Sequence, residues 1–312
     1  MKITQVLDPA HEQWVQGGTF KDLRNVSKIF NQRPIYIGSP FRTQGPLIWI
    51  VSCFKIFLGR HLLFSSLTPL VNYYRVYRFL PKLSKIGLWF THQENSFSKS
   101  ELLALSRCDV IFVHSLKQKK ELEKIVKSKV EVMLGAIEVS RFKDSAVIGR
   151  RIVWVGTPNF RKNPDLLISL ARANPDLDFL LLGKGWSKSP LMKTINSLRN
   201  IEYREIIAPL TSKDFDGCDI YLCTSRIEGG PMPLLESLAA GLHPISTNVG
   251  FVEDLYNFFS ISKQFIFYNF DQIVPLIDEL RENQRKDSFI LQNKITKLSF
   301  ENLSNLIISH YK

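Results

Sequence analysis

The sequence predicts an α/β protein with two doubly wound, Rossmann-like domains, each a parallel sheet with helices on both faces. Short apolar runs alternate with helical patterns on both sides of about residue 145, as βα repeats do. Several runs are continuously hydrophobic, for example Phe179–Leu182 and Ile111–Val113, which is typical of strands buried on both faces. The length of 312 residues suits two domains of ordinary size.

Eleven runs are predicted as strands, with helical patterns between them. The strands are Ile3–Leu7, Pro34–Ile37, His61–Phe64, Ile86–Phe90, Asp109–His114, Val130–Leu134, Arg151–Val155, Asp178–Leu182, Ile201–Arg204, Asp219–Cys223 and Pro244–Thr247. The helical patterns include Phe20–Phe30, Leu116–Val126, Asp165–Ala173 and Leu234–Ala240. We place the domains at 1–147 and 148–312, with the polar stretch Glu138–Arg150 as the hinge. Ser299 is expected to cap a last helix, at about 299–311, that packs back on the first domain.

The composition excludes several classes of protein. With 45% hydrophobic residues the chain can fill cores, so it is neither disordered nor collagen-like. Its four cysteines form no CxxC pair, which argues against a zinc fold or a disulfide scaffold. The first residues do not read as a signal peptide, and no apolar stretch reaches the ~18–20 residues that span a bilayer. We expect a cytoplasmic protein, soluble or peripheral on the cytoplasmic membrane face.

The net charge of +12 is concentrated in the first half of the chain. Residues 1–149 carry 22 Lys and Arg against 11 Asp and Glu, whereas residues 150–312 carry 19 against 18. Between Leu23 and Gln93 there are ten basic residues and no acidic one. Such a field attracts an anionic ligand or an anionic surface.

Aromatic residues interleave with these bases over Val71–Leu80, and Trp49, Phe54, Phe57 and Phe64 lie just before. Three interpretations remain open at this point. The stretch forms core helices whose basic side chains reach solvent at the edges, or it forms a surface for anionic lipid head groups or a polyanionic acceptor, or it binds nucleic acid. No RNP, zinc-finger or helix-turn-helix signature accompanies the charge, which argues against nucleic acid.

Ligands of open α/β sheets bind beyond the carboxyl ends of the strands. Three loops that follow predicted strands carry residues suited to a phosphate ligand. The first loop, Gln16–Thr19, has paired glycines whose backbone amides can approach a phosphate closely. The second, Val155–Pro164, places Arg161 and Lys162 before a helix. Adjacent cations there oppose the helix dipole, which either a bound anion or simple solvation of the loop would explain.

The third loop lies within Ser225–Gly241, after a strand that is predicted to be buried. Its glycines and prolines keep the first part irregular, and Pro233 is expected at the first position of the following helix. Free amides around Leu234 would then form an anion site. Glu236 is expected in the first helical turn, where the dipole favours a carboxylate, whereas Glu228 has no such structural reason for its position.

Other catalytic patterns are absent or poorly placed. The sequence has no G-x-S-x-G, HExxH or P-loop, and its histidines lack metal-ligand spacing. The stretch Asp176-Leu177-Asp178 precedes its strand instead of following it, which favours a loop over a metal site. Eight helical residues would separate Glu228 and Glu236 by roughly 12 Å, more than the ~5–9.5 Å of a glycosidase pair. We interpret them as separate contacts on one ligand and predict no metal.

Motifs spread over Ile152–Leu255 point to a known family. They are Val153–Pro164, Phe179–Gly185, Cys218–Leu222, the E-x7-E element Glu228–Glu236, Ala240–Ile245 and Gly250–Glu253. Weaker echoes in the first half are Gly17-Gly18, Thr91–Gln93, Cys108–Ser115, and Gly135–Glu138 with Phe142. In these motifs the chain resembles retaining glycosyltransferases of the GT-B fold, similar to glycosyltransferase family 4. The resemblance implies two domains that face each other across a cleft.

The resemblance also implies a nucleotide-sugar donor held mostly by the second domain, without a metal or other cofactor. The implied catalytic residues are Glu228, Lys162, Arg161 and His92, and the implied donor-binding residues are Gly17, Gly18, Gly156, Thr157, Gly230, Pro231, Met232, Pro233, Leu234 and Glu236. The two cations would hold the diphosphate with the Gly17-Gly18 backbone and stabilise the leaving group. Glu228 and the Gly230–Met232 backbone would bind sugar hydroxyls, and Glu236 the ribose. His92 would lie near the reacting sugar, unless it is an ordinary polar residue at a strand end.

One position departs from the family pattern. Arg often follows the glycine that ends the strand, and here that position is Thr157. Either Arg161 replaces it in neutralising the phosphates, or catalysis is weakened. The sequence thus predicts a metal-independent retaining hexosyltransferase of polysaccharide biosynthesis, acting on a glycan or a lipid-linked acceptor. The alternatives are a non-catalytic GT-B-like binding protein and a transferase that acts on nucleic acid.

Overall fold

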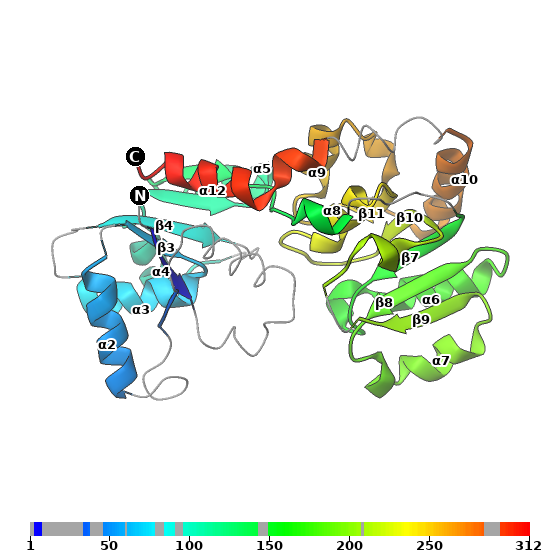
Figure 1. Ribbon diagram of the computed structural model, residues 1–312, viewed down its shortest axis with the longest axis horizontal. Coiled ribbons are helices and arrows are strands. Elements are labelled where there is room, and N and C mark those ends of the chain that lie inside the picture. Colours follow the sequence, from blue (N-terminus) through cyan, green and yellow to red (C-terminus); the bar gives the residue numbers. More distant parts are fainter. Residues whose placement is uncertain are drawn as a thin grey trace. The chain divides into compact units, whose positions relative to one another are not determined.

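The computed structural model of the 312-residue chain describes residues 3–7, 34–37, 46–59, 61–78, 84–90, 96–142, 149–206, 209–283 and 294–312. The chain forms two compact units (Figure 1). The first contains Met1–Ala136 and Phe300–Lys312, and the second contains Ile137–Ser299. The predicted helix Phe20–Phe30, together with Gly17, Gly18 and His92, lies outside the described residues.

The first unit is a parallel sheet of six strands in the order β2-β1-β3-β4-β5-β6. The strands are β1 Thr4–Leu7, β2 Ile35–Tyr36, β3 His61–Phe64, β4 Lys85–Phe90, β5 Val110–Val113 and β6 Lys129–Val132. The helices are α2 Pro46–Phe57, α3 Leu67–Tyr77, α4 Lys99–Leu105, α5 Leu116–Leu122 and, after the second unit in sequence, α12 Phe300–Ser309.

Both faces of this sheet are buried, and the strands show why their sequences are apolar without interruption. Successive side chains of a strand point to opposite faces. Accordingly Leu88 packs in the core cluster on one side of the sheet, whereas its neighbour Trp89 packs in the cluster on the other. Ile111 and Phe112 divide between the two clusters in the same way. A strand with two cores to fill has no solvent-facing position for polar residues.

The second core of this unit is completed by α12. Phe300, Leu303 and Ile307 of α12 and the following Tyr311 are buried against the sheet. The Tyr311 hydroxyl donates a 2.6 Å hydrogen bond to the carbonyl oxygen of Leu62. Gly87 makes room for this ring, because a Cβ atom there would lie 2.2 Å from the Tyr311 hydroxyl oxygen. The last helix therefore belongs structurally to the first unit.

The second unit repeats the architecture, with strand order β12-β11-β10-β7-β8-β9 and all pairs parallel. The strands are β7 Arg151–Val155, β8 Phe179–Gly183, β9 Ile201–Glu205, β10 Cys218–Cys223, β11 His243–Thr247 and β12 Ile266–Phe267. The α-helices are α6 Pro164–Ala173, α7 Leu191–Ser197, α8 Met232–Ala239, α9 Val252–Phe259 and α10 Ile273–Asn283. The 3-10 turns are Val139–Phe142, Phe160–Lys162, Trp186–Lys188, Ser212–Phe215, Lys263–Phe265, Phe270–Gln272 and Thr296–Leu298.

Strand order reverses beside β7, and this reversal positions the candidate site. β7 is the first strand of the second unit, yet it lies between β8 and β10. Val153 of β7 is in register with Tyr221 of β10, so the two strands end side by side. The strands that follow β7 and β10 in the chain, β8 and β11, lie on opposite sides of this pair, and α/β proteins bind ligands at the carboxyl ends of strands at such a reversal.

The predicted fold class is confirmed. All eleven predicted strands overlap a strand of the structure, and the only further strand among the described residues is β12, which has two residues. The run Pro34–Ile37 narrows to the two residues of β2. Short edge strands have few apolar positions, so their sequences carry little periodic signal.

The stretch rich in aromatic and basic residues divides between core and surface. In α3, Val71, Tyr73 and Tyr77 are buried in the core, whereas Arg75 and Arg78 are exposed. For α3 the structure therefore agrees with core packing whose basic edge reaches solvent. Helix α2 differs, because much of its apolar surface is exposed.

All four cysteines are unpaired and buried. Burial raises the pKa of the Cys53 thiol to about 11. Burial likewise raises the pKa of the Cys218 thiol to about 12. A thiol reacts through its thiolate form, so these two side chains should be chemically inert in the folded protein.

We expect a thiol-reactive dye at pH 8 to leave Cys53 and Cys218 unlabelled in the native protein, because a pKa of about 11 leaves only ~0.1% thiolate. Unfolding in urea should expose both thiols and allow complete labelling. Peptide mass spectrometry after labelling measures the outcome. Rapid labelling of Cys53 or Cys218 in the folded protein would contradict the burial of these thiols.

Candidate functional site

The loop after β7 begins at Gly156, where a side chain would crowd the Trp154 ring. The Gly156 amide donates to the Leu182 carbonyl oxygen at 2.9 Å, and the Gly156 carbonyl oxygen accepts from the Trp186 indole at 2.9 Å. A Cβ atom at Gly156 would lie 2.7 Å from the Trp154 ring. The chain then turns outward at Thr157, whose exposed hydroxyl oxygen accepts a 2.7 Å hydrogen bond from the Asn159 side-chain amide.

Arg161 and Lys162 lie on a short turn of their own, before the helix. Asn159 caps this 3-10 turn, since its side-chain oxygen accepts from the Lys162 amide at 3.1 Å. Asn163 follows with a left-handed backbone, φ 53°, and Pro164 opens α6. Both cations therefore precede α6 and lie outside its first turn, the position where a cation opposes the helix dipole most directly.

The loop after β10 is fastened to the loop after β7 by hydrogen bonds. The Thr224 hydroxyl lies 2.9 Å from the Lys162 carbonyl oxygen and accepts from the Trp154 indole at 2.8 Å. The Arg226 amide donates to the Arg161 carbonyl oxygen at 2.7 Å. The Arg226 guanidinium also stacks over the Phe160 ring at 4.2 Å. These contacts fix the positions of Arg161 and Lys162 relative to the loop after β10.

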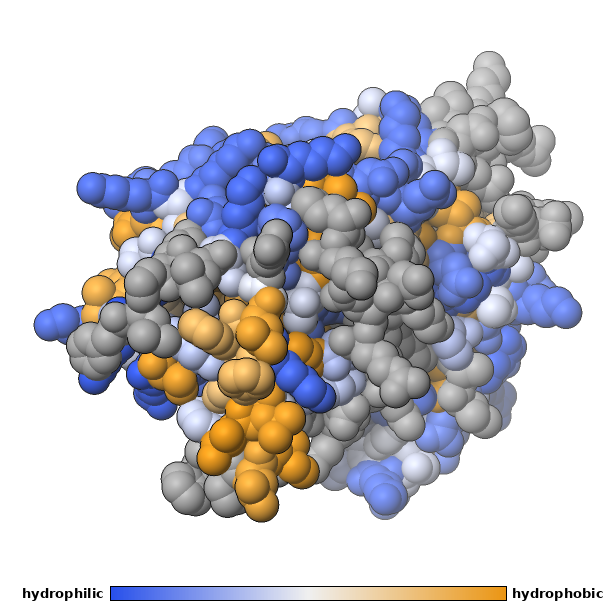
Figure 2. All heavy atoms as spheres, turned by 60° about the vertical axis from the view of Figure 1, so that its left-hand side comes forward, coloured by the Kyte–Doolittle hydropathy of each residue, from blue (hydrophilic) through white to orange (hydrophobic). Residues whose placement is uncertain are grey.

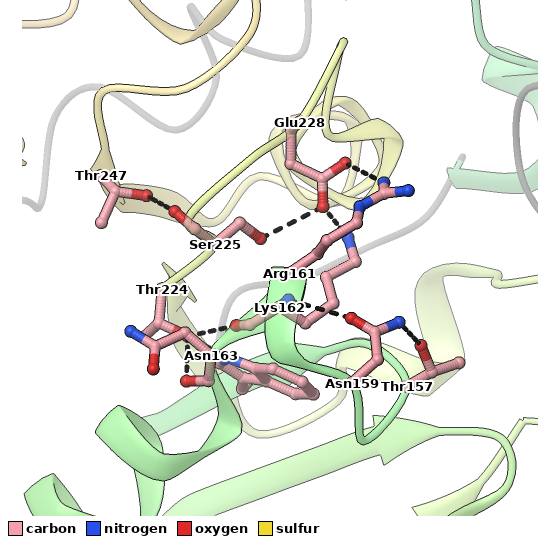
Figure 3. A network of polar contacts seen from close by, with 10 residues as sticks. Thr157, Asn159, Arg161, Lys162, Asn163, Thr224, Ser225, Glu228 and Thr247 are labelled. Carbon is pink, nitrogen blue, oxygen red and sulfur yellow. Dashed lines mark hydrogen bonds and ion pairs between the residues drawn. The ribbon is translucent and has the colours of Figure 1, made fainter. Parts of the chain in front are cut away.

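Glu228 receives both cations (Figure 3). Its carboxylate lies 2.6 Å from the Lys162 Nζ atom and 3.6 Å from an Arg161 guanidinium nitrogen. The Ser225 hydroxyl donates to the same Glu228 oxygen that contacts Lys162, at 3.2 Å. Glu228 is only 6% exposed, whereas the Arg161 side chain is 57% exposed. The structure thus brings together three of the four side chains that were predicted at the reacting centre, and the fourth, His92, lies outside the described residues.

The glycine-rich loop after Glu228 is tightly packed. A Cβ atom at Gly230 would lie 2.2 Å from the ring of Phe251, which is fully buried. Gly250 adopts a left-handed φ of 55°, and a Cβ atom there would lie 2.7 Å from the Gly229 carbonyl oxygen. The backbone at Gly230, which is predicted to bind the donor, is therefore packed closely against the segment that follows β11.

The start of α8 differs from the prediction in two ways. The helix begins at Met232, so Pro233 is its second residue and not its first. The amide of Leu234, which we expected to be free for an anion, donates to the Pro231 carbonyl oxygen at 2.9 Å. Because the helix starts earlier than predicted, its first turn uses an amide that the later start would have left open.

The same shift moves Glu236 out of the first helical turn. Its partner is Arg141, on the 3-10 turn Val139–Phe142, whose guanidinium lies 3.6 Å from a Glu236 oxygen. Arg141 also donates to the Leu210 carbonyl oxygen at 2.9 Å. The Glu236 carboxylate is thus stabilised by the Arg141 cation and not by a place in the first turn of α8. Arg141 could not be predicted as a site residue, since nothing in the local sequence pattern marks it.

Three predicted residues of the first domain, Gly17, Gly18 and His92, lie outside the described residues, and their roles stay predictions. Within the described part of the chain, His, Cys, Asp and Glu side chains form no group of three that could hold a metal ion.

A family model described as "Glycosyl transferases group 1" matches residues 141–297, which is half of the chain. The chain belongs to this family. The matched segment contains the site residues Arg161, Lys162, Glu228 and Glu236, and it begins at Arg141. No curated protein sequence matches the chain.

Solved structures share the fold over nearly the whole chain. A lipopolysaccharide outer core galactosyltransferase, WaaB, is 16% identical, with a TM-score of 0.75 and 99% of each chain covered. HepE from Anabaena in complex with UDP-glucose is 14% identical, with a TM-score of 0.72 and 99% of each chain covered. Sucrose-phosphate synthase from Thermosynechococcus elongatus is 12% identical, with a TM-score of 0.74, covering 100% of this chain and 98% of its own. These likenesses confirm the GT-B fold.

The contact between Lys162 and Glu228 should have a large coupling energy. We expect Lys162→Met to lower the free energy of unfolding by about 3 kcal/mol, because it leaves a buried carboxylate without its closest cation. Adding Glu228→Gln should recover part of that loss, since the uncompensated charge is removed. Arg161→Met serves as the matched control and should cost less than about 1 kcal/mol, because Arg161 is exposed. Urea unfolding of the single and double variants measures the coupling, and strict additivity would contradict it.

Proposed function

We propose that this chain is a metal-independent retaining glycosyltransferase that moves a hexose-like sugar from a nucleotide-diphosphate sugar to a glycan or a lipid-linked acceptor, as in polysaccharide biosynthesis. The observation that carries the proposal is the cluster of Arg161, Lys162 and Glu228 where β7 and β10 end together. Family membership supports it. So does the fold shared with HepE, whose structures contain UDP-glucose, UDP or glucose.

In this proposal the two cations bind the diphosphate and stabilise the leaving group. The bond between the anomeric carbon and the phosphate oxygen breaks, and its electron pair stays on the nucleotide diphosphate. Arg161 and Lys162 offset the charge that develops there, which is the role a metal ion plays elsewhere. The Gly17-Gly18 backbone would add donors from the first domain.

Retention of anomeric configuration follows if the acceptor attacks from the face that the leaving group departs. The acceptor hydroxyl forms the new bond to the anomeric carbon, and its proton passes to the departing phosphate oxygen. Glu228 would bind sugar hydroxyls when the cations turn to the phosphates, with backbone contacts from Gly230–Met232. His92 would lie beside the reacting sugar, and Glu236, oriented by Arg141, would bind the ribose hydroxyls.

Thr157 supplies the argument for a second candidate, a GT-B-like protein that binds a nucleotide sugar without turnover. Its hydroxyl oxygen accepts from Asn159, and it carries no charge to replace the usual arginine. Arg161 favours the catalytic alternative. It lies in the same loop as Thr157 and contacts Glu228, while 57% of its side chain is exposed. It therefore has both the position and the accessibility to bind a phosphate.

We propose a cytoplasmic location, peripheral on the membrane face. The first 149 residues carry 22 basic against 11 acidic side chains, so this half of the chain is attracted to anionic lipid. The same half would meet the acceptor in a GT-B enzyme, which suits an acceptor that is attached to the membrane.

A thermal-shift screen across nucleoside diphosphates and their hexose conjugates tests donor binding. At least one should raise the melting temperature, since a ligand at about 100 times its dissociation constant stabilises by about 2.7 kcal/mol. Lys162→Ala should weaken that nucleotide about 10- to 100-fold through loss of a charge-assisted hydrogen bond. Lys188→Ala, an exposed lysine of the same unit, is the matched control and should leave affinity unchanged.

Release of nucleoside diphosphate from the selected donor then separates the two candidates. A glycosyltransferase should lose about 100-fold or more in turnover with Glu228→Gln, whereas nucleotide affinity should not fall, because the variant removes the carboxylate that competes for both cations. Binding without any turnover by the wild-type chain would favour the non-catalytic protein. If no nucleoside diphosphate stabilises the chain, the proposed function is wrong.

A further inference from the structure

One side of helix α2 packs in the core of the first unit. Cys53 and Ile56 are buried there, and Trp49 and Phe57 are partly buried against the same cluster. The carbonyl oxygen of Cys53 accepts a 2.7 Å hydrogen bond from the Tyr77 hydroxyl. The ring of Tyr77 also stacks on Phe57 with centroids 5.6 Å apart. The core contacts of α2 are thus made by this side of the helix, partly with the end of α3.

The other side of α2 is apolar as well, and it is exposed. The exposed fractions are Leu47 78%, Ile48 61%, Ile50 58%, Val51 51%, Phe54 62% and, just after the helix, Leu58 64%. Four of these residues, at positions 47, 51, 54 and 58, follow the spacing that forms one stripe along a helix. Figure 2 shows the orange patch that apolar residues form on this side of the first unit.

An apolar stripe on the solvent side is not what a surface helix of a globular protein carries. Such a helix normally places charged residues opposite its core face, and a helix that is apolar all round is covered on all sides. Among the side chains described for α2, Lys55 is the only charged one. Exposed apolar patches of this kind mark a surface that something else covers.

The charges around the stripe identify what covers it. The exposed Lys55 is two residues from Cys53, and the exposed Arg75 and Arg78 lie within two residues of Tyr77, so the Tyr77 contacts place these bases on two helices that pack together. No acidic residue occurs between Leu23 and Gln93. A second copy docked through the same stripe would bring like charges together, because this stretch has no acid to pair them. Anionic phosphate head groups above an apolar layer match both the charge and the stripe.

We propose that α2 lies in the head-group region of an anionic bilayer, with the stripe at positions 47, 51, 54 and 58 inserted at the acyl boundary. The basic side chains of Lys55, Arg75 and Arg78 then contact lipid phosphates. Twelve residues give a helix about 18 Å long, which suits a helix lying in the membrane plane. Among the described residues, no helix has both the length and the apolar character needed to cross a membrane.

Helix α2 would be the part of the chain that contacts the membrane in the proposed association, which does not depend on the transfer reaction. Helix α2 belongs to the first unit, whereas the described site residues Arg161, Lys162 and Glu228 belong to the second. A variant of the stripe therefore changes lipid binding without touching the diphosphate site, and the two proposals fail independently.

Vesicle co-sedimentation of the full chain tests the stripe. We expect binding to phosphatidylcholine vesicles that contain phosphatidylglycerol, and little binding to phosphatidylcholine alone. The triple variant Leu47→Ser, Val51→Ser, Phe54→Ser should bind at least about 10-fold more weakly. The matched control Leu116→Ser with Ile125→Ser removes exposed apolar residues elsewhere in the same unit and should change binding less than about twofold. Circular dichroism and the nucleotide-induced thermal shift check that each variant is folded.

A fluorescent label distinguishes insertion from electrostatic attraction. Since the native cysteines are buried, Phe54→Cys can be labelled selectively with an environment-sensitive dye, with Leu116→Cys as the control position. The dye at position 54 should shift to the blue on anionic vesicles, and the dye at position 116 should not. Binding without that blue shift would mean attraction by charge alone and would overturn the proposal.

Two further outcomes would also overturn it. The first is no vesicle binding by the wild-type chain in low salt, where electrostatic attraction is strongest. The second is a wild-type dimer, detected by light scattering without lipid, that the triple serine variant converts to a monomer, because the stripe would then be an interface between copies. In either case the nucleotide-induced thermal shift still reports separately on the proposed function.

Discussion

The carboxylate of Glu228 is the constraint on which the geometry of the site depends. A buried carboxylate costs several kcal/mol unless a cation and hydrogen-bond donors surround it. Lys162 at 2.6 Å and the Ser225 hydroxyl at 3.2 Å supply them. The lysine can stay there only because Thr224 and Arg226 hold the backbone of its loop. The loops after β7 and β10 therefore stabilise each other, and the side chains at their ends have little freedom.

This arrangement also limits which ligands can use the site. Arg161 and Lys162 already share one negative charge with Glu228, so a ligand must compete with that carboxylate for both cations. A neutral sugar has no charge with which to compete. A diphosphate brings more negative charge and more acceptor oxygens than one carboxylate, and Lys162 has three donors to divide between two partners. We expect a ligand with several negative charges to displace Glu228 from both cations, which would leave its carboxylate to accept hydrogen bonds from hydroxyl groups.

Much of the fold and part of the site could be predicted from the sequence. Strands such as Ile111–Val113 show as unbroken apolar runs because both faces of the sheet are buried. Lys162 and Glu228 could be expected to meet because the carboxyl ends of neighbouring parallel strands lie together. The pair of Arg141 and Glu236 could not, since it joins residues far apart in sequence whose local patterns carry no mark of it. Whether the aromatic residues near Phe54 lie in a core or on a surface stayed open in the sequence, because apolar residues suit both, and only the packed helix shows which side of α2 is exposed.

The position of α12 has a consequence for how the first unit forms. Trp89 and Phe112 face a core that is closed by Phe300, Leu303 and Ile307, residues that follow the whole second unit in sequence. Until α12 is present, this face of the sheet exposes large apolar side chains, which is a hazard for aggregation. The cluster on the opposite face consists of residues from Val6 to Val130, which all precede the second unit. The core around Trp89 and Phe112 can therefore be completed only after the second unit has been synthesised, which makes it depend on contacts of high sequence separation.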